Sequence, residues 1–223
     1  MKRIKLADRH LPNYTKAEEQ LNTITHILGG VLGIVALVLC VVRAASGQNH
    51  WGVVSAVIYG ASMIAVFTIS SVYHGMKPGY GKKVMQVVDH CTIYGLIAGT
   101  YTVIVLSALR PQYPLLGWGL FFFEWALALV AITLTAIDLK MYNTFSMICY
   151  VGMGWAVIPF WKQVLTVLTM PGFLLLLSGG IAYTIGAVLY GLGAKRRWMH
   201  GIFHVFVDLG ALLQFLSVWL YAL

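Results

Sequence analysis

The sequence predicts an all-α integral membrane protein, a single bundle of seven transmembrane helices. Of its 223 residues, 60% are hydrophobic and only 10% are charged, whereas about a quarter of a soluble domain is charged. A membrane-spanning helix needs about 20 mostly apolar residues. Seven stretches meet that length: residues 23–42, 51–73, 86–109, 114–135, 143–161, 171–193 and 200–222. They use nearly all of the chain after the N-terminal tail, so no room remains for a separate soluble domain.

The beginning of the chain is polar, and we expect residues 1–18 to form a cytoplasmic tail and residues 19–223 the transmembrane domain. Thr15 and Glu18 have capping-box spacing, which predicts a helix along the membrane surface around residues 15–21. The first apolar stretch is longer than the hydrophobic region of a signal peptide, and the tail before it has mixed charge. We therefore expect the first span to be uncleaved.

The later stretches differ in how regular a helix they predict. The fifth contains Gly152, Gly154 and Pro159, so we expect a kinked or short helix there. Small residues within spans, such as Gly29-Gly30 and Gly179-Gly180, predict close contact between helices. The three cysteines all fall within spans without CxxC spacing, so we interpret them as buried, inert thiols.

The distribution of basic residues predicts the orientation of the bundle. The net charge is +8, but the basic residues lie in the tail and in short loops. We therefore interpret this charge as a signal of membrane orientation, by the positive-inside rule, and not of nucleic-acid binding. Only Arg43, Arg110 and Lys162 fall on one side of the predicted bundle, and the other 12 of the 15 Lys and Arg residues fall on the opposite side. We therefore predict a cytoplasmic N-terminus and an external C-terminus.

Two histidines at the start of the last span are the first functional signal. His200 and His204 are four residues apart, so one helix face presents both imidazoles, as in many metal sites. Ionisable side chains at membrane depth are costly and point to function. Other polar side chains are predicted at the same depth, at the cytoplasmic ends of the first three spans: Glu19, Asn22, His26, Ser70, His74 and Asp89.

This set of side chains suits zinc. Catalytic zinc sites use three protein ligands plus a water, and His74, His200 and His204 can supply three nitrogens from two helices. Asp89 can hold the water, act as general base or ligate the metal, and Ser70 can donate a hydrogen bond to a carbonyl or a water. The residues expected to orient these groups are Glu19, Asn22 and His26.

Each of these residues also has a simpler interpretation. An interfacial histidine often only bonds at a helix end, and a serine in a span often bonds to its own backbone. Asp208, one turn beyond His204, can orient a ligand or relay protons, or be a buried, bonded acid. Glu124 can be a neutral acid bonded to a neighbouring helix, and His90 is expected at a helix interface.

The order of these residues resembles the haemolysin III family, the bacterial branch of the progestin and adipoQ receptor family. The matching pieces span the whole bundle: Glu19-x2-Asn22-x3-His26, Ser70-x3-His74, Asp89-His90-Cys91-Thr92-Ile93-Tyr94 running to Ala98-Gly99-Thr100-Tyr101-Thr102, and His200-x3-His204 followed by Phe206-Val207. The resemblance implies a seven-helix bundle with a cytoplasmic N-terminus and zinc on His74, His200 and His204. It also implies that Asp89 lies beside the water on the zinc.

The chain departs from the family pattern at three positions. Val103 stands where bacterial relatives usually have proline, Gln214 where many have histidine, and Asp208 where an apolar residue is usual. None is a proposed ligand. Because of the last two departures, the existence of a proton path along the seventh span is an open question.

These observations favour a zinc-containing protein of the bacterial inner membrane that hydrolyses a lipid amide or ester near the cytoplasmic face. A membrane lipid is then the expected substrate. Two other functions remain open. One is a non-enzymatic, receptor-like or membrane-homeostasis protein with structural zinc, and the other is a cytolytic protein. An open coordination position beside a roomy cavity would favour the enzyme.

Overall fold

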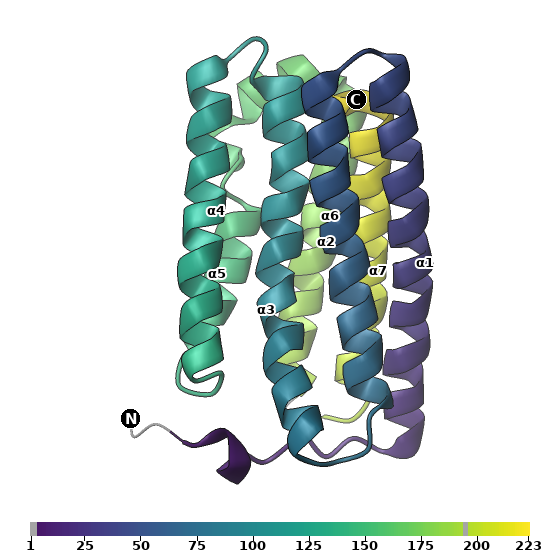
Figure 1. Ribbon diagram of the computed structural model, residues 1–223, viewed down its shortest axis with the longest axis vertical. Helices are drawn as coiled ribbons and strands as arrows, with labels where there is room; N and C mark the ends of the chain where they lie inside the picture. The colour runs from purple at the N-terminus through teal and green to yellow at the C-terminus, as the bar shows by residue number, and fades with distance from the viewer. Residues whose placement is uncertain (1–3, 194–195) are drawn as a thin grey trace.

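The computed structural model describes residues 4–193 and 196–223, and the secondary structure of that part is helical throughout. The long helices run side by side along the long axis of the molecule, alternating in direction (Figure 1). Their bounds are α1 Lys16–Ser46, α2 His50–Gly75, α3 Tyr80–Val103, α4 Pro114–Ile137, α5 Asn143–Gly154, α6 Trp161–Gly193 and α7 Met199–Ser217. The shorter helical segments are η1 Leu6–Asp8, η2 Ile104–Leu109, η3 Ile158–Phe160 and η4 Val218–Ala222.

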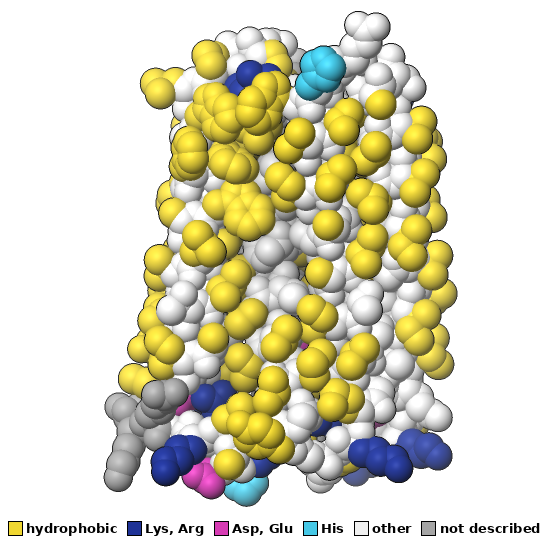
Figure 2. Space-filling model, viewed as in Figure 1, with side chains coloured by type: hydrophobic (Ala, Val, Ile, Leu, Met, Phe, Trp, Pro, Cys, Tyr) yellow, Lys and Arg dark blue, Asp and Glu magenta, His cyan; other side chains and the backbone are white. Residues whose placement is uncertain are grey.

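The side of the bundle is apolar enough to face lipid. Six helical runs are long and apolar enough to cross a membrane, and one of them, Asn143–Gly193, is 51 residues long, about twice what one span needs. Leu28 and Phe122 are two large apolar side chains that are each 63% exposed. Figure 2 shows many more apolar side chains along the visible face. A soluble protein rarely exposes so large an apolar surface. The chain is therefore a multi-pass membrane bundle.

The first helix begins where the capping box predicts. Thr15 accepts a hydrogen bond from the Glu18 backbone N–H (3.3 Å), and the Glu18 carboxylate accepts one from the Thr15 N–H (2.8 Å). However, α1 then continues unbroken for 31 residues. The prediction of a separate surface helix is therefore wrong: the capping box starts the first long helix itself.

The fifth span is interrupted, as its glycines and proline predict. α5 has only 12 residues and ends at Gly154, and the backbone leaves the α-helical path before the short segment η3, which contains Pro159. Helical structure resumes at Trp161 and runs past the expected edge of the span, until Thr169 adopts a φ of 60° just before Pro171. The span is thus two shorter helices, because proline lacks the N–H that a continuous helix would need.

Glycines allow close contact between the helices, as predicted. A Cβ added to Gly60 of α2 would lie 2.7 Å from the Leu37 Cα of α1, and one added to Gly29 of α1 would lie 2.4 Å from the Phe67 ring of α2. These distances are too short for any larger residue without movement of a neighbour. The contacts bring α1 and α2 together along most of their length.

The basic residues gather mainly at one end of the bundle, as Figure 2 shows for the visible face. We call this the basic end; there α1, α3, α5 and α7 begin and α2, α4 and α6 finish (Figure 1). The tail crosses beneath the bundle at this end. Two basic residues are not where the sequence predicts: Lys82 and Lys83 lie in the first turn of α3 instead of in the loop before it, and Lys82 is only 4% exposed. The orientation of the basic end toward the cytoplasm remains a prediction.

Candidate metal centre

The three histidines predicted to bind metal meet at the basic end. His74 comes from the last turn of α2, and His200 and His204 come from the first two turns of α7. The His200 Nε2 lies 3.3 Å from the His74 Nε2 and 3.0 Å from the His204 Nε2. His74 and His204 are 2% and 1% exposed. The three rings therefore point the same nitrogen at a common point shielded from solvent.

The spacing of these nitrogens fits a metal ion. One nitrogen from each ring lies within 4.8 Å of the others. In a tetrahedral site with Zn–N bonds of about 2.0–2.1 Å, the ligand atoms are about 3.3 Å apart. The two measured separations are close to that value. The triad can therefore hold a metal ion without large movement.

A carboxylate sets the tautomer of His74. The Glu19 Oε2 lies 2.6 Å from the His74 Nδ1, and the Glu19 Oε1 accepts from the Lys82 ammonium at 2.5 Å. Lys82 also donates to the His74 and Met76 carbonyls. Because a carboxylate only accepts, the His74 Nδ1 carries the proton and the Nε2 lone pair faces the other two histidines. This is the tautomer that coordination of a metal through Nε2 requires.

The other two histidines are held mainly by ring packing. Among the described residues, neither the His200 Nδ1 nor the His204 Nδ1 has a hydrogen-bond partner. His26 of α1 stacks on His204 with ring centroids 3.7 Å apart and 25° between the planes. Tyr14 stacks on His200 at 4.9 Å and 19°. Burial, with nearby Tyr190 and Glu19, raises the pKa of Tyr14 above its ordinary value, so its phenol stays neutral.

A cavity of mainly apolar lining opens beside the triad. It contains about 1610 Å³ of unfilled space, including the part open to the outside. It follows α3 from Asp89 to the start of η2 at Ile104, which is about 22 Å at the helical rise of 1.5 Å per residue. The side chains of His26, Ser70, Asp89, His200 and His204 line it near the triad. The Ser70 hydroxyl lies beside the Asp89 carboxylate. Polar, titratable groups therefore meet a long apolar space.

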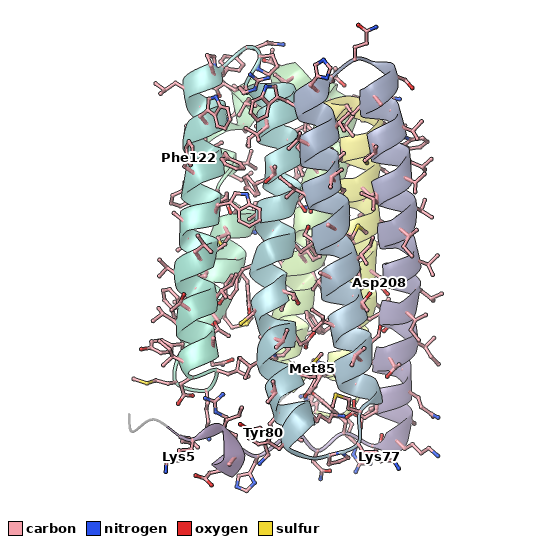
Figure 3. All side chains as sticks on the ribbon, viewed as in Figure 1. Lys5, Lys77, Tyr80, Met85, Phe122 and Asp208 are labelled. Carbon is pink, nitrogen blue, oxygen red and sulfur yellow. The ribbon has the colours of Figure 1, made fainter. Side chains whose placement is uncertain are left out.

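The remaining predicted residues differ in how closely they approach the triad. The Asn22 amide lies 3.4 Å from the His74 Nδ1, a weaker contact than that of Glu19. His26 makes no hydrogen bond among the described residues, so it contacts the site by stacking alone. Asp208 lies at mid-height in the bundle (Figure 3), and its Oδ1 has no partner in the described part of the chain. It neither lines the cavity nor bonds to a triad residue.

The contacts of three side chains were not predicted from the sequence. The carboxylate of Glu124 is fully buried, and neither oxygen finds the expected partner on a neighbouring helix within the described residues. Lys82 and Tyr14 contact the site and were missed. The sequence offers no clear signal for Lys82, because it precedes the predicted third span and resembles a loop lysine. It offers none for Tyr14, because the path of an irregular tail has no periodicity.

The fold and the triad together define a class: a multi-pass helical membrane protein with a histidine group able to hold a metal ion near one end. Comparison with known proteins identifies the family of the chain. Residues 14–215 match the family described as Haemolysin-III related, and the chain belongs to this family.

Its relatives include bacterial and animal proteins. The chain is 37% identical to Hemolysin-3 of Bacillus cereus over 206 residues, covering 92% of each protein. It is 36% identical to the Hemolysin-3 homolog of Bacillus subtilis, covering 93% of this chain and 96% of the relative. It is 26% identical to the human Monocyte to macrophage differentiation factor, covering 78% of this chain and 73% of the relative.

Proposed function

We propose that this protein is a zinc-dependent hydrolase of a lipid amide or ester. The observation that carries the proposal is the triad, whose Nε2 atoms converge beside a cavity long enough for a lipid chain. Zinc suits the site because it prefers tetrahedral coordination and imidazole ligands. Three protein nitrogens leave one coordination position free, which catalysis needs and a closed structural site lacks.

In such a reaction the residues of the site have separate roles. His74, His200 and His204 would hold the zinc, which would supply a Lewis acid beside the scissile carbonyl. In this proposal the Asp89 carboxylate, which lines the cavity, takes a proton from the attacking water and returns it to the leaving group. The Ser70 hydroxyl, beside Asp89, can donate to the carbonyl oxygen. The apolar wall holds the lipid tail in place and excludes water from it.

The charge distribution supports a location for the proposed reaction. The triad lies at the basic end, and the positive-inside rule places basic loops in the cytoplasm. We therefore propose a site on the cytoplasmic side of the bacterial inner membrane. A membrane lipid would enter the cavity from the bilayer, with its head group near the triad.

A structural role for the metal is the main alternative, because the triad joins α2 to α7 and Glu19 adds α1. The variant Asp89→Asn separates the two. It keeps the size of the side chain but removes its basicity. If Asp89 is the general base, the metal stays bound and lipid turnover falls by on the order of 100-fold or more. If Asp89 is a fourth ligand in a closed site, the same change releases metal and lowers the melting temperature.

The substrate for this assay comes from lipidomics on membranes with and without the protein. Glu124→Gln is the matched control, since it removes another buried carboxylate that does not line the cavity. The control should keep both metal and turnover. Retained metal together with unchanged turnover in Asp89→Asn would contradict the catalytic role. Cytolysis rests only on the names of the bacterial relatives.

A further inference from the structure

His200 is one of two proposed ligands whose orientation no hydrogen bond at Nδ1 explains within the described residues. His74 is fixed by Glu19, but the His200 Nδ1 has no hydrogen-bond partner among the described residues. Metal-binding histidines usually donate that second N–H to an acceptor, which fixes the ring. Rotation of the His200 ring must therefore be limited by packing. Of its aromatic neighbours outside the triad, Tyr14 is nearly parallel (19°), whereas Phe203 and Tyr190 are tilted by 40° and 55°.

Tyr14 comes from the N-terminal tail, and its place is set by the first turn of α1. It directly precedes Thr15, whose capping bonds with Glu18 fix where the helix begins. The other oxygen of Glu18 accepts from the Trp198 N–H at 2.8 Å. Trp198 caps α7, two residues before His200, with a φ of 66°. One buried carboxylate thus fixes Tyr14 and the start of the His200 helix relative to each other.

The far end of the tail is also attached to the bundle. The Arg9 guanidinium lies 3.4 Å from the Asp138 carboxylate at the end of α4, and the Ile4 N–H donates to the same carboxylate at 3.1 Å. Lys83 of α3 donates to the Ala7 carbonyl. Burial would raise the pKa of Asp138, but the backbone N–H donors and Arg9 hold it below its ordinary value. The carboxylate therefore stays charged, and the tail is held at both ends beneath the bundle (Figure 1).

From these contacts we propose that Tyr14 is a positioning residue of the metal centre. Its ring holds the His200 imidazole in the ligand orientation and covers the side of the triad that faces the basic end. Tyr14 also lies 5.9 Å from the His74 ring, so it spans two of the three ligands. The attached tail keeps Tyr14 in place, and a metal ion would leave the triad toward this end only after the tail moves. The inference rests on the proposed metal site.

The rate of metal release tests this role. The purified full-length protein and its variants are loaded with zinc, mixed with excess chelator, and followed by the appearance of the zinc–chelator complex. We expect Tyr14→Ala to release zinc about 10-fold faster or more, as loss of the partners that orient ligands typically weakens metal sites by 10–100-fold. Tyr14→Phe keeps the ring and should release zinc at close to the parental rate. The matched control is Tyr80→Ala, which removes a 63% exposed tyrosine at the same end.

A second variant tests the proposal even if Tyr14→Ala fails to fold. Asp138→Asn weakens the attachment of the tail without touching the triad, and should also speed zinc release, by a smaller factor. Parental release rates in both Tyr14→Ala and Asp138→Asn would overturn the proposal, as would a Tyr14→Phe variant as fast as Tyr14→Ala. If the parent protein holds no zinc, the proposed function fails instead, so the two failures are distinguishable.

Discussion

At the scale of the residue, each histidine of the triad is held in a different way. A carboxylate fixes His74, a tyrosine stacks on His200, and another histidine stacks on His204. The meeting of the three histidines could be predicted from the sequence, because spacing along a helix gives depth and depth brings polar residues into one layer. Tyr14 and Lys82 could not be predicted, since one lies on an irregular tail and the other resembles a loop lysine.

The link from Lys82 through Glu19 to His74 predicts the effect of removing the charge of Glu19. Glu19→Gln can still accept from the His74 N–H, but it gives Lys82 no counter-charge and makes His74 a weaker ligand. Metal affinity should fall about 10-fold, and Glu19→Ala should fall further, toward 100-fold. Competition with a chelator of known affinity measures both. The exposed tail variant Asp8→Asn is the control, and equal affinities in all four proteins would refute the link.

At the scale of the element, small side chains determine where two helices pack closely, and glycine and proline determine where a helix is interrupted. The interruption after Gly154 could be predicted from two glycines and a proline. The extent of the following helix to Leu168 could not, because the turn at Thr169 depends on how the next helix packs. Glu18 illustrates the same limit: its capping role is local and predictable, but its bond to Trp198 joins residues 180 positions apart.

The contact of Gly60 with α1 predicts the cost of one added methyl group. Gly60→Ala places a Cβ 2.6 Å from the Leu37 Cβ and 2.7 Å from its Cα, so the two helices must move apart. We expect a loss of about 1–3 kcal/mol in stability, seen as a lower melting temperature in detergent. Gly119→Ala in α4 is the control, because nothing lies within 4 Å of the added Cβ, and it should be neutral or stabilising. An unchanged melting temperature for Gly60→Ala would contradict the packing.

At the scale of the whole molecule, polar chemistry is concentrated at the basic end and the sides are apolar. The Haemolysin-III related family and the multi-pass bundle follow from sequence pattern and are confirmed. The cavity could not be predicted, because it depends on how α3, α5, α6 and α7 pack together and not on any one of them.

The charge asymmetry predicts how the bundle lies in the membrane. A phosphatase reporter that is active only after export, fused after Leu223, should be active. The same reporter inserted at residues 77–79, between α2 and α3, should be inactive. Activity in the second fusion and not in the first would reverse the proposed orientation and move the triad to the outer face.

The central claim is that His74, His200 and His204 form a metal site, and elemental analysis of the purified protein tests it most directly. We predict about one zinc per chain, since one triad supplies one tetrahedral site. The double variant His200→Ala, His204→Ala should lose nearly all of it, while His50→Ala, at the opposite end of the bundle, should keep it. Full zinc content in the double variant, or none in the parent, would contradict the claim.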